Sequence, residues 1–387
     1  MRRHLAVAAA FLLSCVSAPP LLRTAAVPIE VTQNHVYVPV SVGKNAPSWF
    51  LLDTGAAVTA VAQTTAEALH LRAGERGRVR GAGPAIVETS VFHDLDLDVG
   101  GNAMHVSRVA GIPLLEPSLV EGRALEGILG RSVIGQAAIT VDYERRELRF
   151  GAGAPEGAVV VPITFNAGRP VVAAELTLND GRVLPLRMLV DTGARSILLN
   201  RPFTEEHGIY DALAPSIEGP FSVGIGGVSR QLMGRAKRFA FAGFTFDAPI
   251  VAAAKDAAGA TAERELDGLI GGEILRRFTV TFDYARRRML LVPNRRLHDP
   301  FDVDMSGAGY KAADLKFDRI LVRYVIGNSP ASEAGLEERD EIVSVDGNKV
   351  TLGQLRALFG EPGKHHVVRV RRGGREFDAT IVTRRLV

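Results

Sequence analysis

Residues 50–61 read FLLDTGAAVTAV, so an apolar run leads directly into an acid, a hydroxyl and a glycine. Residues 188–199 read MLVDTGARSILL and repeat this pattern. A carboxylate that follows an apolar run is expected to be partly buried, which is unfavourable unless the group is paired or shares a proton. A single Asp-Thr-Gly could be an ordinary tight bend. The second copy suggests instead that Asp53 and Asp191 are each other's partner.

The repeat extends beyond these two segments. Residues 125–130 (LEGILG) are matched by residues 266–271 (LDGLIG), at an offset of 141 (125 to 266). Residues 141–143 (VDY) and 282–284 (FDY) keep the same offset. Matches that recur at a nearly fixed offset indicate two diverged copies of one structural unit.

With two Asp-Thr-Gly segments and two apolar-apolar-Gly motifs, the chain resembles the aspartic proteases, retropepsin-like in its motifs and bilobal like the pepsins. The resemblance covers roughly residues 27–297. It implies a mainly β fold in which two homologous pepsin- or retropepsin-like β-lobes, residues 27–150 and 158–297, form one active-site cleft. Residues 151–157, rich in Gly, Ala and Pro, are the expected linker.

The resemblance implies that Asp53 and Asp191 are the catalytic residues. Two facing carboxylates cannot both ionise readily, so they share a proton and titrate as a pair. The ionised member then activates a water molecule, and the protonated member donates to the carbonyl oxygen of a peptide bond. Neither a metal nor a cofactor is needed. The supporting residues that the resemblance implies are Thr54, Gly55, Thr192, Gly193, Gly130 and Gly271.

Charges beside the two loops depart from the retroviral pattern. Arg131 is present after the first apolar-apolar-Gly motif, but the position with which it would pair is Ala57. In the second lobe the roles are exchanged, which predicts an ion pair between Arg195 and Glu273.

The residue after each Asp-Thr-Gly is Ala56 in one loop and Ala194 in the other. In pepsins a hydroxyl residue stands there and can donate a hydrogen bond to the carboxylate, which lowers its pKa. Because a methyl group donates nothing, we expect this pair to keep its shared proton to a higher pH than in pepsin.

Two glycine-containing segments, residues 78–92 and 222–230, are candidate flaps over the cleft, although both could be plain hairpins. Neither contains a tyrosine, so the retroviral type of flap fits better than the pepsin type. Thr64 with Glu67 predicts a capped helix over 66–71, and Thr204 is expected to open the equivalent helix.

Residues 303–387 form a third segment, in which residues 329–336 (SPASEAGL) and 340–347 (DEIVSVDG) resemble the bacterial PDZ module, an α+β domain. The resemblance implies binding of a peptide C-terminus beside a helix over 352–359, which Thr351 should cap. Arg339 stands where a turn glycine is usual and should strain that turn. Backbone N–H groups can hold a carboxylate without a charged side chain, and the candidate loop comprises Gly307, Ala308, Gly309 and Tyr310.

Residues 1–15 predict a secretory signal peptide, because a charged start is followed by a short apolar run. Residues 12–15 (LLSC) resemble the lipobox of bacterial lipoproteins. Lipidation of Cys15 would place the protein on the periplasmic side of a membrane, with Val16 favouring the outer membrane. The alternative is a soluble periplasmic protein whose ordinary signal is cut near Ala18 or Ala26.

Composition is that of a globular protein with two or three domains, with 47% hydrophobic and 23% charged residues. One cysteine excludes a disulfide framework. The net charge of +3 comes from scattered basic residues, so no nucleic-acid partner is expected. There is no metalloprotease, Walker or serine-hydrolase motif.

The sequence therefore predicts an exported aspartic endopeptidase that acts on proteins or peptides and carries a C-terminal PDZ domain. A different class remains open. The protease-like lobes and the PDZ domain could instead make up a non-catalytic peptide-binding or scaffold protein.

Overall fold

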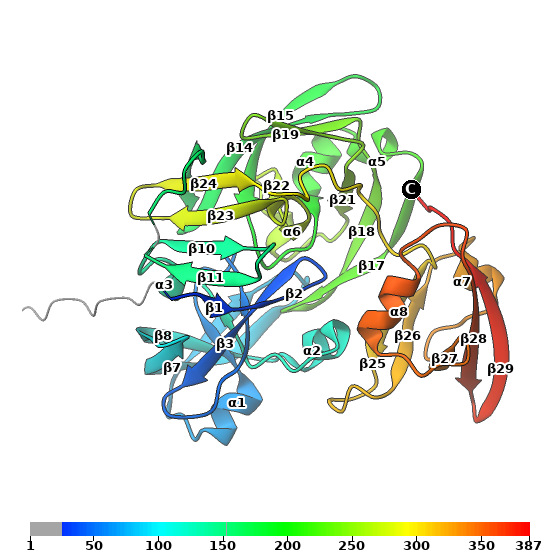
Figure 1. Cartoon of the computed structure of the whole chain (residues 1–387), viewed down its shortest axis with the longest axis horizontal. Coiled ribbons are helices and arrows are strands. Elements are labelled where there is room, and N and C mark those ends of the chain that lie inside the picture. Colours follow the sequence, from blue (N-terminus) through cyan, green and yellow to red (C-terminus); the bar gives the residue numbers. More distant parts are fainter. Residues whose placement is uncertain (1–24, 152) are drawn as a thin grey trace, which may run out of the picture.

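The structure is a computed structural model and describes residues 25–151 and 153–387. Figure 1 shows two β-rich lobes and a separate C-terminal β-domain on one side of them. The predicted signal segment and Cys15 lie outside the described residues. No helix within the described part of the chain is long and apolar enough to cross a membrane.

The first lobe is built on an eight-stranded sheet in the order β2-β3-β4-β9-β5-β8-β7-β6. Strand β3 also pairs with β7, so this sheet closes on itself. The elements of this lobe are β2 (Glu30–Thr32), β3 (His35–Val42), β4 (Ser48–Leu52), β5 (Ala60–Ala62), α1 (Gln63–Ala68), β6 (Ala73–Arg80), β7 (Ile86–Val99), β8 (Asn102–Ile112), α2 (Leu115–Glu121), β9 (Gly127–Leu129) and α3 (Arg131–Ile134).

The second lobe repeats this order in a ten-stranded sheet, β17-β18-β21-β16-β22-β15-β14-β19-β20, with β13 paired to β14. Its elements are β13 (Thr164–Asn166), β14 (Arg169–Thr177), β15 (Val183–Val190), β16 (Ile197–Leu199), α4 (Arg201–Glu206), α5 (Ile209–Ala212), β17 (Ser216–Gly224), β18 (Gly227–Arg235), β19 (Arg238–Phe241), β20 (Phe244–Asp247), β21 (Ile250–Ala254), η1 (Ala260–Ala262), β22 (Gly268–Ile270) and α6 (Gly272–Leu275). The predicted duplication is therefore present in the strand topology.

A third, six-stranded sheet joins the two lobes in the order β1-β11-β10-β23-β24-β12. Its strands are β1 (Val27–Pro28), β10 (Ile139–Asp142), β11 (Glu147–Phe150), β12 (Val159–Pro162), β23 (Phe278–Asp283) and β24 (Arg288–Pro293). Residues 138–150 and 278–292, expected as hairpins that finish each lobe, do form the hairpins β10–β11 and β23–β24. In addition, β10 pairs with β23 across the lobes, with Thr140 opposite Thr281 and their hydroxyl oxygens 2.8 Å apart.

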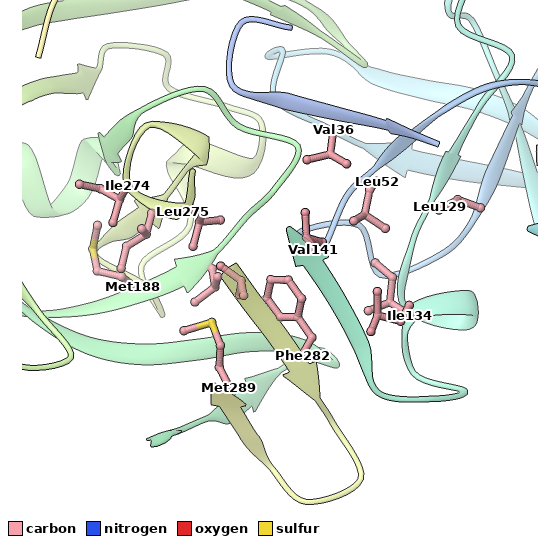
Figure 2. Packing of buried hydrophobic residues seen from close by; sticks show 14 of the residues in the cluster. Val36, Leu52, Leu129, Ile134, Val141, Met188, Ile274, Leu275, Phe282 and Met289 are labelled. Atoms are coloured by element: carbon pink, nitrogen blue, oxygen red, sulfur yellow. The ribbon is translucent and has the colours of Figure 1, made fainter. Parts of the chain in front are cut away.

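The hydrophobic core crosses this sheet without interruption. Figure 2 shows Val141 and Phe282 between side chains of the first lobe, such as Leu52, and side chains of the second, such as Met188. Fully burying one such side chain stabilises a fold by roughly 1.5–3 kcal/mol. The two lobes thus share one core, which fixes their relative position.

The C-terminal domain has its own five-stranded sheet, β25-β26-β27-β28-β29, and its own core, which includes Tyr310, Leu355 and Phe359. Thr351 caps α8 through a capping box with Gln354, as predicted. Its elements are β25 (Ala308–Ala312), β26 (Ile320–Val325), α7 (Pro330–Glu333), β27 (Glu341–Val345), α8 (Leu352–Leu358), β28 (His365–Arg372) and β29 (Arg375–Val382).

Two predicted helix caps are wrong. Helix α1 begins at Gln63 directly after β5, so Thr64 lies inside it and the first turn has no side-chain cap. Helix α4 begins after Asn200, with Pro202 in its first turn, where proline favours a helix start. Thr204 lies within α4 and its hydroxyl donates to the carbonyl oxygen of Asn200 (2.9 Å).

Candidate active site

Each Asp-Thr-Gly follows a central strand of its lobe. Asp53 comes directly after β4, which lies parallel to β9, and Asp191 comes after β15, which lies parallel to β22. The Asp53 amide donates to the carbonyl oxygen of Leu129 (3.0 Å), and the Asp191 amide donates to that of Ile270 (2.9 Å). The two apolar-apolar-Gly motifs therefore pass directly behind the two loops.

The glycines that end these motifs permit a close backbone approach. A Cβ on Gly130 would lie 2.3 Å from the carbonyl oxygen of Val58, and a Cβ on Gly271 would lie 2.5 Å from that of Ser196. Both distances are shorter than any ordinary carbon–oxygen contact, so only glycine fits at either position without a backbone shift.

The two threonines of the motifs lock the loops together. The hydroxyl of Thr54 donates to the carbonyl oxygen of Val190, and the hydroxyl of Thr192 donates to that of Leu52, both at 2.7 Å. Each hydroxyl also accepts from the backbone N–H of the other threonine, at 3.1 and 3.0 Å. Both threonines are buried. Four reciprocal hydrogen bonds therefore fix one loop against the other, as the resemblance implied.

This lock brings the two carboxyl groups into hydrogen-bond contact. A Cβ on Gly55 would lie 2.6 Å from Cγ of Asp191, and a Cβ on Gly193 would lie 2.5 Å from Cγ of Asp53. Each glycine therefore leaves the space that the aspartate of the opposite lobe occupies. The structure thus brings together all six residues of the two Asp-Thr-Gly motifs.

Burial and mutual charge set the protonation of the pair. Burial raises the pKa of Asp53 well above its usual value, and the negative charge of Asp191 and the hydrogen bond between the carboxyl groups raise it further. Burial also raises the pKa of Asp191, but the N–H of Gly193, which donates to it at 2.8 Å, opposes that rise. The pair therefore retains one shared proton to a higher pH than an ordinary aspartate.

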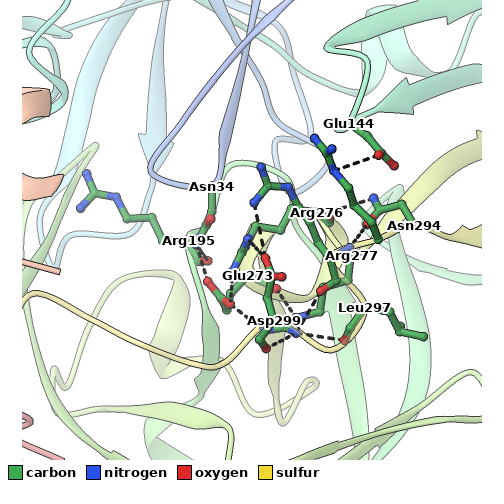
Figure 3. Close-up of polar contacts among 11 residues, drawn as sticks. Asn34, Glu144, Arg195, Glu273, Arg276, Arg277, Asn294, Leu297 and Asp299 are labelled. Carbon is green, nitrogen blue, oxygen red and sulfur yellow. Dashed lines mark hydrogen bonds and ion pairs between the residues drawn. The ribbon is translucent and has the colours of Figure 1, made fainter. Parts of the chain in front are cut away.

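The predicted ion pair between Arg195 and Glu273 is wrong. The guanidinium of Arg195 binds Glu121 at the end of α2, while Glu273 pairs with Arg276 and Arg277, each at 2.9 Å. Figure 3 shows Glu273 turned toward these two arginines and away from the Arg195 guanidinium. The two segments still meet, because the Glu273 amide donates to the backbone oxygen of Arg195 (2.8 Å).

Glu121 is a buried residue that sequence reasoning missed. It also accepts from the hydroxyl of Tyr37 and lies 3.4 Å from Nδ1 of His35. Burial opposes its ionisation, but Arg195, His35 and the bond from Tyr37 outweigh burial and hold the pKa of Glu121 well below its usual value. Glu121 thus links the first lobe to the loop that carries Asp191. A lone glutamate in a helix without a capping residue gives no signal of this in the sequence.

Arg131 also has a partner that the sequence does not reveal. Its guanidinium donates to the carbonyl oxygen of Gly168 in the second lobe (2.9 Å) and lies over the ring of Phe165. It therefore joins the lobes, whereas retropepsins use this arginine for a pair with an aspartate.

The two glycine-containing segments are hairpins whose tips meet. The first hairpin is β6–β7 and the second is β17–β18. The Gly83 amide donates to the carbonyl oxygen of Ile225 (2.9 Å), and the Ala85 amide donates to that of Gly226 (3.1 Å). Since one hairpin comes from each lobe, the arrangement matches the retroviral type of flap more closely than a single pepsin-type flap.

The candidate carboxylate loop of the C-terminal domain has internal hydrogen-bond partners. The amide of Gly307 donates to Oδ1 of Asp304 (3.2 Å), and that of Ala308 donates to the hydroxyl of Ser306 (3.2 Å). Gly309 and Tyr310 belong to β25. Burial raises the pKa of Asp304 to about 6. A carboxylate of the chain itself thus lies where the carboxylate of a peptide was expected.

Two family comparisons match parts of the chain. A family described as aspartyl protease matches residues 38–133 and 174–274, and a family described as PDZ domain matches residues 321–372. No curated protein matches the chain. Among solved structures, the crystal structure of an aspartic proteinase from Irpex lacteus is 15% identical, with a TM-score of 0.46 over 71% of this chain and 98% of that chain.

Proposed function

The chain belongs to the aspartyl protease family, and on that premise we propose that it is an aspartic endopeptidase in which Asp53 and Asp191 together activate one water molecule. The observation that carries this proposal is the set of four hydrogen bonds from Thr54 and Thr192, which hold the two carboxyl groups in contact. A partly buried pair that shares one proton is the state that general acid–base hydrolysis requires.

The proposed reaction needs no covalent intermediate. The ionised carboxylate of the pair accepts a proton from a water molecule as the water oxygen attacks the peptide carbonyl carbon. The protonated carboxyl group donates its proton to the carbonyl oxygen, which gives a neutral tetrahedral intermediate. The C–N bond then breaks as the amine takes a proton from one carboxyl group, while a hydroxyl of the intermediate returns a proton to the other carboxylate and becomes the new carbonyl oxygen. The pair is thereby restored to its state with one shared proton.

Two features favour an endopeptidase. We propose that the two hairpins, one from each lobe, cover the pair of aspartates, so that a bound polypeptide would be held on both sides of the bond that is cut. The hairpin tips meet through backbone hydrogen bonds, which suits recognition of peptide backbone over a length of chain rather than of a free terminus.

The test is hydrolysis of a degenerate peptide library by the full-length protein and by Asp53→Asn and Asp191→Asn. Each substitution should reduce turnover by at least about a thousandfold, because both carboxyl groups act on the same water. Asp247→Asn, at a solvent-exposed carboxylate on β20, is the matched control and should cut normally. A metal chelator should have no effect. Near wild-type turnover by either dyad variant would exclude the mechanism.

The same experiment distinguishes the enzyme from the alternative, a non-catalytic peptide-binding or scaffold protein. In that case the full-length protein would bind library peptides without cutting them, and the Asp53→Asn substitution would not change product formation. Both Asp-Thr-Gly motifs are complete and their loops are locked, which favours the enzyme.

We further propose that the PDZ domain binds a peptide through its free C-terminus, and that the protein is exported and lipid-anchored at Cys15 on the periplasmic side, with the outer membrane favoured over a soluble periplasmic form. The PDZ proposal is tested by comparing peptides that end in a free carboxylate with the same peptides amidated. Equal affinity for both would exclude recognition of a C-terminus.

A further inference from the structure

Helix α2 of the first lobe lies against the side of the PDZ domain where a peptide would bind. The PDZ groove runs between β25, which ends the sheet order, and helix α8. Helix α2 contacts β25, and the residue after it, Gly122, lies against Leu352 of α8, so that a Cβ there would be 3.0 Å from Leu352 Cδ2. Figure 1 shows α2 beside β25 and α8.

Polar contacts tie α2 to both walls of the PDZ groove. Lys311 on β25 forms an ion pair with Glu116 on α2 (2.8 Å). Arg356 on α8 donates through one nitrogen to the carbonyl oxygen of Val120 on α2 (2.7 Å) and to that of Tyr310 on β25 (3.1 Å). Arg356 thus binds a carbonyl of α2 and a carbonyl of the strand that a peptide would join. The groove has an occupant that belongs to the chain itself.

The PDZ domain also holds the second hairpin below its tip, at residues 219–221 of β17, a part of the hairpin that we call its base. The ring of Tyr324 lies edge-on to that of Phe221 on β17 at 5.9 Å, and a nitrogen of Arg323 lies 3.4 Å from the Phe221 carbonyl oxygen. A Cβ on Gly219 would lie 2.8 Å from Cδ1 of Ile326. Helix α2 contacts β17 from the first lobe.

The second hairpin is therefore held both at its tip and at its base. Its tip is bonded to the first hairpin through Ile225 and Gly226, and its base is packed on α2 and the PDZ domain. For a polypeptide to reach the aspartates the hairpins must separate, and the second cannot swing outward while its base is held.

We propose that α2 is the internal ligand of the PDZ groove, and that the docked PDZ domain is a clamp that keeps the second hairpin closed over the aspartate pair. This inference rests on the proposed protease function for its kinetic consequence only. Release of α2 from the groove frees the base of the hairpin and admits substrate, and a peptide that enters the groove competes with α2.

The first test is Glu116→Lys, which places a like charge opposite Lys311 and leaves the PDZ domain unaltered. The clamp predicts an increase in kcat/KM of about fivefold or more, the lower range of ordinary coupling between sites. The double variant Glu116→Lys with Lys311→Glu restores the ion pair and should return to the wild-type rate. Asp378→Lys is the matched control. Asp378 on β29 also forms an exposed ion pair, with Arg369 on β28 at 3.0 Å, but these strands lie at the other end of the PDZ sheet from β25.

The second test does not depend on catalysis. Amide hydrogen exchange is measured on residues 115–121 and 216–235 in full-length Asp53→Asn, with and without Glu116→Lys. The clamp predicts faster exchange in both segments when Glu116 is replaced, and tighter binding of peptides with free C-termini. If the parent protein cuts nothing but exchange responds in this way, the proposed catalysis fails and the clamp stands. Unchanged exchange, or a fall in kcat/KM in the Glu116→Lys protein, would overturn the clamp.

Discussion

Ala56 and Ala194 each follow an Asp-Thr-Gly and offer no side-chain donor to the carboxylates. Backbone N–H groups of Gly55, Ala56 and Gly193 oppose the rise in the pKa of the pair, and the charges of His35 and Arg169 also oppose it at Asp191. We therefore expect optimal cleavage at about pH 5 to 6.5, above the range of pepsin. A hydroxyl donor stabilises the ionised form, so the double variant Ala56→Ser with Ala194→Ser should shift both limbs of the pH–rate profile downward.

The pH dependence of kcat and of kcat/KM checks this expectation. A wild-type profile that peaks below about pH 3, where the pepsin pair titrates, would show that another group sets the pKa. A double variant with an unshifted profile would show that the added hydroxyls do not reach the carboxylates.

Glu121 gives a prediction about stability. Because its pKa is lowered in the folded protein, its contribution to the free energy of unfolding is present above its ordinary pKa of about 4.3 and is lost as the pH falls through the depressed value. Glu121→Gln leaves Arg195 without its counter-charge and should reduce that free energy by roughly 3 kcal/mol at pH 7. The deficit should shrink below about pH 4.

Urea unfolding at pH 7 and at pH 3 measures both values. Glu147→Gln is the control, since Glu147 pairs with Arg149 near the surface and its loss should change stability by no more than about 1 kcal/mol. A deficit in Glu121→Gln that is equal at both pH values would contradict the assignment of an ionised Glu121.

Single residues were predictable where the motif itself specifies the contact. Asp53, Thr54 and Gly55 lie where the motif places them because their partners belong to the second copy of the same motif. The partner of Arg195 could not be predicted in this way. Glu121 reaches it from α2, where the second lobe has only the short helix η1. Glu273 is held instead by the two arginines that directly follow its own helix.

Among the structural elements, the two hairpins give a prediction about the closure of the site over substrate. A Cβ on Gly83 would lie 2.2 Å from the backbone carbon of Gly226, so Gly83→Ala should keep the tips apart. Unlike release of the hairpin base, loss of the tip contact impairs closure over bound substrate. We expect kcat/KM to fall by about tenfold or more, because closure completes such sites.

Gly327→Ala is the matched control, because a Cβ at that position would contact nothing within 4 Å. Protected Gly83 and Ala85 amides in the wild type and unprotected ones in Gly83→Ala would confirm that the tips are the affected contact. Normal kcat/KM in Gly83→Ala would show that the closed tips play no part in turnover.

Elements were predictable where hydrophobic alternation or a capping box identifies them, as for β3, β4 and α8. Helix α2 was not, because Leu114, the residue before its first turn, supplies no capping side chain and the helix is held by contacts with β17 and β25. The starts of α1 and α4 were misjudged for a related reason. Strand β5 runs directly into α1, so the chain direction and not Thr64 sets where that helix begins.

At the scale of the whole molecule, the proposal of a lipid anchor gives a direct prediction. If Cys15 is diacylated, the protein should fractionate with membranes, and Cys15→Ser should release it, because stable attachment depends on the lipid chains. Membrane fractionation and mass spectrometry of the mature N-terminus measure this. A mature protein that begins after residue 15 would exclude the anchor and favour the soluble periplasmic alternative.

The division into two lobes and a PDZ domain was predictable because repeats and motifs recur along the chain. The sheet that joins the lobes was not, since the pairing of β10 with β23 leaves no local pattern. Docking of α2 on the PDZ domain likewise depends on single contacts, such as that of Lys311 with Glu116, between residues far apart in sequence.

The pairing of β10 with β23 has a consequence for the direction in which a polypeptide binds. Thr140 lies opposite its own counterpart, Thr281, while Ile139 lies opposite Phe282 and Val141 opposite Val280, so the two halves are related by a local two-fold axis. A cleft on such an axis accepts a chain equally well in either of its two directions. The single PDZ domain breaks that equivalence, because it packs on β17 and not on its counterpart β6. We therefore expect a bound polypeptide to adopt one preferred direction, from amino to carboxyl end, relative to the second hairpin.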